Sequence, residues 1–236
     1  MIVCPICTVK NHHLSAVCSS CGSYIQTRID GIDLFSTIWL LFEAPRNAFK
    51  KILLSRRKNF ILVVSGVAGI EFLSFVFQLL CVADRGLNLF NILLYLLLLA
   101  PATGVLIQFV VSLFLFAAVR AIGSQSTFLN IRAVWSWSML PICLLALGIL
   151  PLEVSSFGIY LFTKTPQLIL MNGTSFILFS MLHLFGFVWS AILLIIGVSV
   201  LTDRKVRDAI LPSFAGLALS MTMLYYGVRA IHWMIS

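Results

Sequence analysis

Apolar residues gather in five long runs, and the polar residues of the chain stand almost entirely before and between these runs. The runs cover residues 60–83, 89–119, 133–150, 176–201 and 209–234. About 20 apolar residues suffice for an α-helix to cross the ~30 Å hydrocarbon core of a bilayer. The pattern therefore predicts an all-α polytopic membrane bundle of about five transmembrane helices over residues 60–236.

Prolines fall inside three of these runs, and in the fifth run Pro212 stands in the first turn, where proline is well tolerated. The second run is longer than a bilayer requires, so we expect it to tilt or to kink near Pro101 and Gly104. The third run is the shortest, and Pro141 interrupts it. A run interrupted by proline could instead be two short helices.

The composition agrees with lipid as a solvent for part of the chain. Hydrophobic residues make up 61% of the 236 residues and charged residues only 10%, whereas soluble domains have about half and one quarter. The net charge of +8 would suggest a nucleic-acid partner in a soluble protein. Here the cations cluster beside apolar segments, which favours anionic lipid head groups as their partners.

The cations also predict the orientation. With the N-terminus inside, the outer loops receive only Arg85, Lys164 and Arg229 of the 16 basic residues. Because loops rich in Lys and Arg stay in the cytoplasm, we expect a cytoplasmic N-terminus and, after five spans, an external C-terminus. The membrane is expected to be the cytoplasmic membrane of a prokaryote. We expect no cleaved signal peptide, so the first span would direct insertion.

Four cysteines stand in two tight pairs before the first run. Cys4 and Cys7 form one CxxC pair, Cys18 and Cys21 form the other, and ten residues separate the pairs. Each pair directs two thiolates to one point, and four thiolates complete the tetrahedral shell of a structural Zn²⁺ ion. Residues 1–28 are therefore predicted to be a zinc-ribbon-like knob. Reduced thiols agree with a cytoplasmic N-terminus.

Other interpretations of this knob stay open. Iron in a rubredoxin-like site also accepts four thiolates. A redox pair is less consistent with two matched pairs that point to one shared ion. His12 and His13 lie between the pairs and could replace a cysteine, although a solvated loop explains them more simply. Because Lys10 is the only Lys or Arg between the first and the last cysteine, we expect a protein partner for the knob and no nucleic acid.

Residues 29–59 form a predicted amphipathic collar on both sides of Pro45, and Asp33 stands where a helix N-cap would be. An apolar face surrounded by cations is typical of a helix that lies in the membrane interface, with tryptophan at head-group depth. The predicted interface residues, in contact with an anionic cytoplasmic leaflet, are Trp39, Phe49, Lys50, Lys51, Arg56, Arg57 and Lys58. The collar could equally pack on the inner ends of the spans, and both can hold at once.

A few polar residues lie inside the predicted spans. Glu71 is near the middle of the first span, and Gln78 follows it on the same helical face. An acid at this depth is costly unless it is protonated or paired, so we expect it to face the bundle, with Gln108, His183 or Arg229 as its partner. It could relay protons or bind a cation. Alternatively, it forms an interhelical hydrogen bond that fixes packing.

Four stretches of the chain match one known family in their residue types and in their order along the sequence. They are the proline-containing collar at 43–52, the end of the second span at 120–128 with a glycine and then a phenylalanine, the aromatic-to-proline run at 133–141, and the basic turn that leads to Pro212. In these features residues 31–236 resemble the Yip (Ypt/Rab-interacting protein) family of five-span membrane proteins.

The resemblance implies a five-span body, and a zinc ribbon before such a body resembles the prokaryotic members. The eukaryotic members are linked to Rab GTPases and to vesicle traffic of the ER and Golgi. Their longer cytosolic tail is not found in this sequence, so GTPase binding is not carried over.

The leading functional hypothesis is a non-enzymatic scaffold that organises membrane or recruits a partner through its cytoplasmic zinc ribbon. The alternative is a small transporter or lipid-handling protein that uses Glu71. We expect no enzyme, because an intramembrane zinc protease requires His-Glu-x-x-His and an aspartyl type requires two acids in its spans. By the boundaries above, Glu71 is the one acid inside a span.

Overall fold

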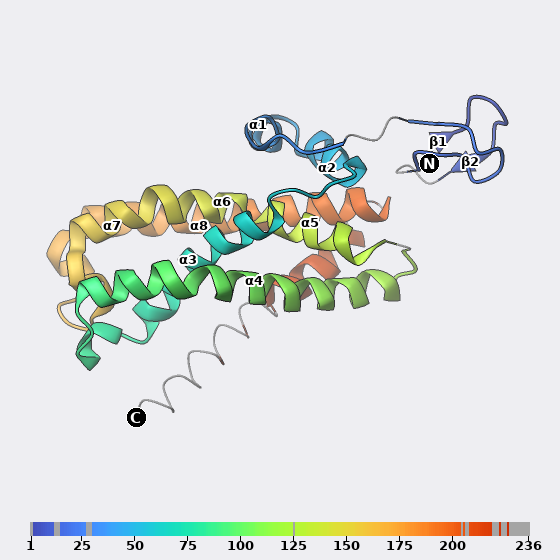
Figure 1. The fold of residues 1–236 in the computed structure, drawn as a ribbon. Helices are drawn as coiled ribbons and strands as arrows, with labels where there is room; N and C mark the ends of the chain where they lie inside the picture. Colours follow the sequence, from blue (N-terminus) through green and yellow to red (C-terminus); the bar gives the residue numbers. More distant parts are fainter. Residues whose placement is uncertain are drawn as a thin grey trace.

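The computed structural model describes residues 2–11, 15–26, 30–124, 126–203, 205, 208–218, 222 and 226. Within them, helices form an elongated bundle, and the only named strands form one small hairpin near the N-terminus (Figure 1). Four of the described helices are long and apolar enough to cross a membrane. The predicted fold class, an all-α membrane bundle, is confirmed, but the described residues contain four such spans rather than five.

The first two spans lie close to their predicted positions. Helix α3 covers Ile61–Leu79, and the short 3₁₀ helix η1 (Val82–Arg85) leads into α4 (Leu89–Ala121). Asn88 caps α4 by accepting a hydrogen bond from the Asn91 backbone N–H at 2.8 Å. Helix α4 continues through Pro101 as one uninterrupted helix.

The third predicted span, 133–150, has the wrong boundaries, because the apolar helical stretch long enough to cross a membrane is Leu140–Phe162. The helical path has five consecutive parts: α5 (Phe128–Ser138), α6 (Leu140–Leu144), the π-helical η2 (Leu145–Ile149), α7 (Leu150–Phe157) and the 3₁₀ helix η3 (Gly158–Phe162). Pro141 and Pro151 each stand in the first turn of a new part, where a missing N–H is tolerated. The prolines therefore divide the path without ending it.

Helix α8 covers Leu168–Thr202 and contains one non-helical residue, Asn172. The Asn172 side chain accepts a hydrogen bond from the Ser175 backbone N–H at 3.2 Å, as an N-cap does. Beyond this kink, α8 agrees with the predicted fourth span within a few residues. Of the predicted fifth span, 209–234, a helix over Asp208–Ala218 is described, and most of the remainder lies outside the described residues.

Two short helices precede the spans. Helix α1 covers Leu34–Glu43, and α2 covers Pro45–Leu54. The predicted N-cap is confirmed, since Asp33 accepts a hydrogen bond from the Ser36 backbone N–H at 2.8 Å. This hydrogen bond, with help from Lys51, holds the pKa of the Asp33 carboxyl below its usual range.

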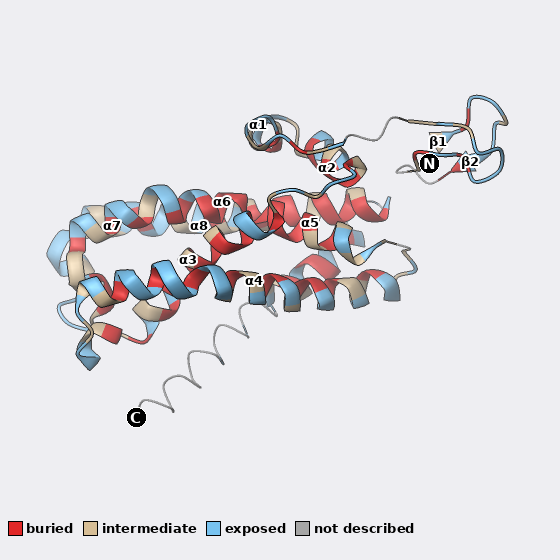
Figure 2. Ribbon diagram, in the orientation of Figure 1, coloured by how far each residue is buried: buried red, intermediate tan, exposed pale blue. Residues whose placement is uncertain are grey.

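The most buried span is α3, and glycines bring it against α4. A Cβ atom on Gly69 would lie 2.1 Å from the Ala100 carbonyl oxygen, and one on Gly104 would lie 2.1 Å from the Ser65 carbonyl oxygen. No side chain fits between these backbones, so the two helices touch at their glycines. Figure 2 shows the contrasting outer face of α4, where exposed positions recur along the helix; many of these are leucines, as expected for a surface that faces lipid.

Substitution of Gly69 by alanine should separate α3 from α4. Because the added Cβ meets backbone rather than a movable side chain, we expect Gly69→Ala to lower the free energy of unfolding by about 1–3 kcal/mol. Denaturant or thermal unfolding in detergent measures this change. Gly148→Ala is the matched control, since nothing lies within 4 Å of its Cβ position. Equal stability of the two variants would contradict the contact.

Candidate functional site

Two matching turns form the N-terminal knob. Strands β1 (Ile2–Val3) and β2 (Lys10–Asn11) pair antiparallel around the first cysteine pair, and an isolated bridge between Val17 and Tyr24 encloses the second. In the first turn the Thr8 backbone N–H donates to the Cys4 carbonyl oxygen at 3.0 Å. In the second turn the Gly22 backbone N–H donates to the Cys18 carbonyl oxygen at 3.1 Å. Both Thr8 and Gly22 have a positive φ.

The two turns bring all four thiols to one place. The Sγ atoms of Cys4 and Cys21 are 3.6 Å apart, those of Cys7 and Cys18 are 3.4 Å apart, and all four lie within 4.8 Å of one another. A tetrahedral ion with metal–sulfur bonds of about 2.3 Å separates its sulfur atoms by roughly 3.8 Å. The predicted ligands Cys4, Cys7, Cys18 and Cys21 therefore form a possible metal site, and their geometry suits Zn²⁺ or iron equally.

Neighbouring polar groups support the thiols. The Ser23 hydroxyl lies 3.1 Å from the Cys4 sulfur and 3.0 Å from the Cys21 sulfur, and the buried Asn11 amide donates to the Cys18 sulfur at 3.4 Å. Such contacts orient metal ligands and favour the thiolate form. His12 and His13, the possible substitutes for a cysteine, lie outside the described residues.

The same contacts change the acidity of the thiols. The Ser23 hydroxyl, together with backbone N–H groups of the first turn, lowers the pKa of Cys4 to about 6. Backbone N–H groups of Cys21 and Ser20 lower the pKa of Cys18. At Cys7 the Val9 N–H also favours the thiolate, but hydrogen bonds with the Cys18 and Cys21 sulfurs outweigh it and raise the pKa to about 12. Metal binding has to displace the protons that remain.

The predicted interface residues of the collar separate into two groups. Trp39 is exposed and donates a hydrogen bond from Nε1 to the Glu43 carboxylate at 3.1 Å, and the cations at 50, 56 and 57 are exposed as well. Lys51 donates to the Ser36 hydroxyl at 2.8 Å. Lys58 instead donates to the Ile52 and Leu53 carbonyl oxygens at 2.5 and 2.6 Å, where it caps the C-terminal end of α2.

The prediction of Phe49 as an interface residue is wrong. Its side chain is completely buried, and a Cβ atom built on Gly197 of α8 would lie 3.0 Å from the Phe49 ring. Glycine at 197 therefore leaves the space that the ring fills. Helix α2 packs on the bundle through its apolar face, whereas α1 exposes Phe35 and Trp39.

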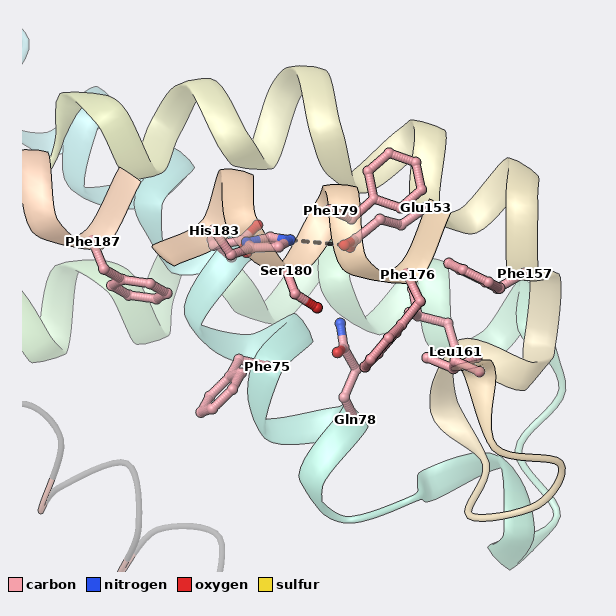
Figure 3. Close-up of a pocket in the computed structure, with 12 residues that line it drawn as sticks. Phe75, Gln78, Glu153, Phe157, Leu161, Phe176, Phe179, Ser180, His183 and Phe187 are labelled. Atoms are coloured by element: carbon pink, nitrogen blue, oxygen red, sulfur yellow. Dashed lines mark hydrogen bonds and ion pairs between the residues drawn. The ribbon is translucent and has the colours of Figure 1, made fainter. Parts of the chain in front are cut away.

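Within the bundle, an imidazole joins two acids. His183 of α8 places Nδ1 2.9 Å from Oε1 of Glu71 on α3, and Nε2 2.8 Å from Oε1 of Glu153 on α7. Both glutamates are 5% exposed. Figure 3 shows the contact between Glu153 and His183 as a dashed line. Of the proposed partners of Glu71 that lie among the described residues, His183 is thus the one that contacts it.

The prediction that Glu71 is the one acid inside a span is wrong, because Glu153 is a second. The error follows from ending the third span at residue 150, before Pro151, which placed Glu153 in an outer loop. The available signal was the apolar run that continues to Phe162, with proline in a first helical turn.

Two other predicted partners of Glu71 lie elsewhere or remain undescribed. Gln108 is buried, donates to the Ser112 hydroxyl at 3.1 Å and accepts from the Arg132 guanidinium at 3.2 Å, so it belongs to a separate polar group. Arg229 lies outside the described residues. Gln78 lines the same cavity as Glu71 and lies 3.4 Å from the Ser74 hydroxyl.

The two acids and the histidine face a cavity of about 230 Å³ between α3, α7 and α8. Gln78 and Ser180 add further polar groups to its wall. Much of the remaining wall is aromatic (Figure 3), with phenylalanines at 75, 157, 176, 179 and 187. The arrangement can hold or exchange protons and can offer a negative charge to a ligand.

The thiol cluster predicts one bound metal ion per chain. We expect the purified protein to contain about one Zn²⁺, and Cys18→Ser to lose most of it, because one thiolate of the tetrahedral shell is removed. Elemental analysis by mass spectrometry measures both contents. Cys81→Ser is the control, since Cys81 is the N-cap residue of η1 and does not belong to the thiol cluster. Iron in place of zinc, or no metal in the unmodified chain, would contradict the zinc assignment.

Comparisons with known proteins add no relatives to this description. No family model matches the chain, and no curated protein and no solved structure matches it either.

Proposed function

We propose that this protein is a non-enzymatic membrane scaffold whose metal-held knob recruits a protein partner on the cytoplasmic side of a prokaryotic membrane. The spans would anchor the knob, the collar would place it close to the surface of an anionic leaflet, and Zn²⁺ would supply most of the folding free energy of a ribbon too small for a core.

The observation that carries this proposal is the apolar surface of the knob. Ile6 is 73% exposed and Tyr24 is 84% exposed, and Val3, Val9 and Val17 are exposed as well. Several exposed apolar side chains on so small a unit are typical of a docking surface. The first turn places Ile6 between two ligand cysteines, so a bound metal would fix it in position.

The arrangement of the helix ends supports a common side for the knob and the cationic loops. The C-terminal ends of α4 and α8 and the start of α5 lie at the end of the bundle nearest the knob, whereas η1 and η3 lie at the opposite end (Figure 1). Arg120 and Arg132 belong to the first set, and Arg85 and Lys164 belong to the second. This is the division of charges on which the proposed cytoplasmic N-terminus rests.

The sequence resemblance to the Yip family is consistent with a scaffold of this kind. It remains a proposal, supported by the collar, the long second span and the proline run.

Site-specific photocrosslinking in intact cells tests the docking role. We expect a photoreactive residue at position 6 of the full chain to give a defined adduct with one protein, because this side chain projects from the metal-held turn. Introducing Cys18→Ser into the same chain should abolish that adduct, since the turn loses its metal. Mass spectrometry identifies the captured protein.

The control is the same photoreactive residue at Tyr160, an exposed position at the far end of the bundle. It should not give this adduct. Identical adducts with and without Cys18→Ser, or adducts with membrane lipid alone, would refute metal-dependent docking.

A second candidate function is transport, and Glu153 is the observation that favours it. A lone acid in a span is weak support for a transporter, but two acids joined by an imidazole at a cavity resemble a proton-handling site.

Proton flux in proteoliposomes tests the transport function. We expect Glu71→Gln and Glu153→Gln each to lose most of the flux, because each removes an ionisable group from the cluster. Glu43→Gln is the matched control, since Glu43 is an exposed acid on the collar. Equal flux in all four proteins would eliminate this function.

A further inference from the structure

The cluster of Glu71, His183 and Glu153 has to contain more protons than a neutral imidazole supplies. A neutral ring donates from one nitrogen and accepts at the other. Here both ring nitrogens of His183 contact a carboxyl oxygen, at 2.9 and 2.8 Å. Each of these two contacts requires a proton between the nitrogen and the oxygen. The three groups therefore share at least two protons, as an imidazolium between two carboxylates or as a neutral ring between a carboxylate and a carboxylic acid.

Both forms leave one net negative charge. This charge lies among buried side chains, and the second oxygen of each acid, Oε2, has no hydrogen-bond partner among the described residues. A buried charge with unsatisfied acceptors is costly. One further positive charge, delivered into the cavity beside these oxygens, would make the cluster neutral.

The walls of the cavity indicate what form that charge takes. Phenylalanine rings surround the polar cluster, and aromatic faces attract organic cations. A metal ion is not favoured, because among the described residues the four cysteines of the knob, and not these three residues, gather their donor atoms as a metal shell requires. The volume of about 230 Å³ lies below the usual range for sites of drug-sized ligands, so the ligand is small.

We propose that the cavity between α3, α7 and α8 binds a small organic monocation, of the quaternary ammonium or amine class, against Glu71 and Glu153. The ligand takes the place of a third proton on the cluster. The proposed binding site uses the same residues as the second candidate function, transport, but it does not require that the protein transports anything. It concerns binding, so binding without flux leaves it standing, and flux of protons without binding of the cation overturns it.

Binding should depend on pH in one direction. Among the described residues that line the cavity, the titratable groups are Glu71 from α3, Glu153 from α7 and His183 from α8. As the pH falls, a third proton neutralises this cluster and removes the charge that attracts the ligand. Affinity for an organic cation should therefore weaken at low pH, and a neutral ligand of the same shape should show no such dependence.

The experiment measures equilibrium binding of radiolabelled benzyltrimethylammonium to the full chain in lipid nanodiscs. We expect saturable binding that unlabelled benzyltrimethylammonium displaces and that its neutral isostere, neopentylbenzene, does not. The double variant Glu71→Gln, Glu153→Gln should lose saturable binding, because a neutral imidazole between two amides carries no negative charge, whereas each single variant retains one carboxylate. Glu43→Gln should leave it unchanged. Size-exclusion profiles and unfolding midpoints establish that each variant is folded.

If the double variant does not fold, the pH series on the unmodified chain decides the matter. Binding that weakens as the pH falls supports the proposal. Absence of saturable binding, equal displacement by the neutral isostere, or affinity that is independent of pH would each overturn it.

Discussion

The lack of water in the hydrocarbon core of a bilayer is the constraint on which this structure depends. Polar groups within a membrane-spanning bundle have to find their partners in the protein. One imidazole meets much of this requirement, because His183 contacts an acid on α3 and an acid on α7 while it stands on α8. A single side chain thus links three of the spanning segments. It also brings the ionisable groups of these segments to one cavity. The same three residues therefore hold the helices together and form a polar site.

Close backbone packing holds the acids where the ring can reach them. The glycine contact of α3 with α4 fixes the central span from one side, and the hydroxyls of Ser65 and Ser136, 2.9 Å apart, join it to α5 on another. Helix α8 also packs through a glycine, here against a side chain, since a Cβ atom on Gly186 would lie 2.6 Å from the Leu145 side chain in η2. This glycine stands one turn beyond His183. Small residues therefore determine how near the three polar side chains can approach.

Local patterns predicted the parts of the molecule whose chemistry lies close together in the sequence. The spacing of the cysteines identified the thiol cluster, Asp33 identified the start of α1, and apolar length identified α3, α4 and most of α8. Predictions failed where the outcome depended on packing between distant segments. The sequence around Phe49 indicates an interface residue, but in the structure Gly197, far along the chain, leaves a space that its ring fills. The sequence allows Gln108 as a partner of Glu71, but in the structure Gln108 accepts a hydrogen bond from Arg132 instead. Glu153 was missed because the predicted third span ended at residue 150, whereas the apolar helical stretch continues to Phe162.

The knob and the bundle solve opposite problems with the same principle. The knob lies outside the helices and has too few residues to bury a core, so directed bonds from four soft sulfur atoms have to replace apolar burial. The bundle has abundant apolar surface but no solvent for its acids, so an internal ring has to replace water. Each part therefore concentrates its polar chemistry at one point, and each point acquires a ligand-binding character as a consequence. Thiolates suit a soft metal ion, whereas carboxylates among phenylalanine rings suit an organic cation. The collar joins the two, because Phe49 of α2 fills a space on α8, the helix that also carries His183.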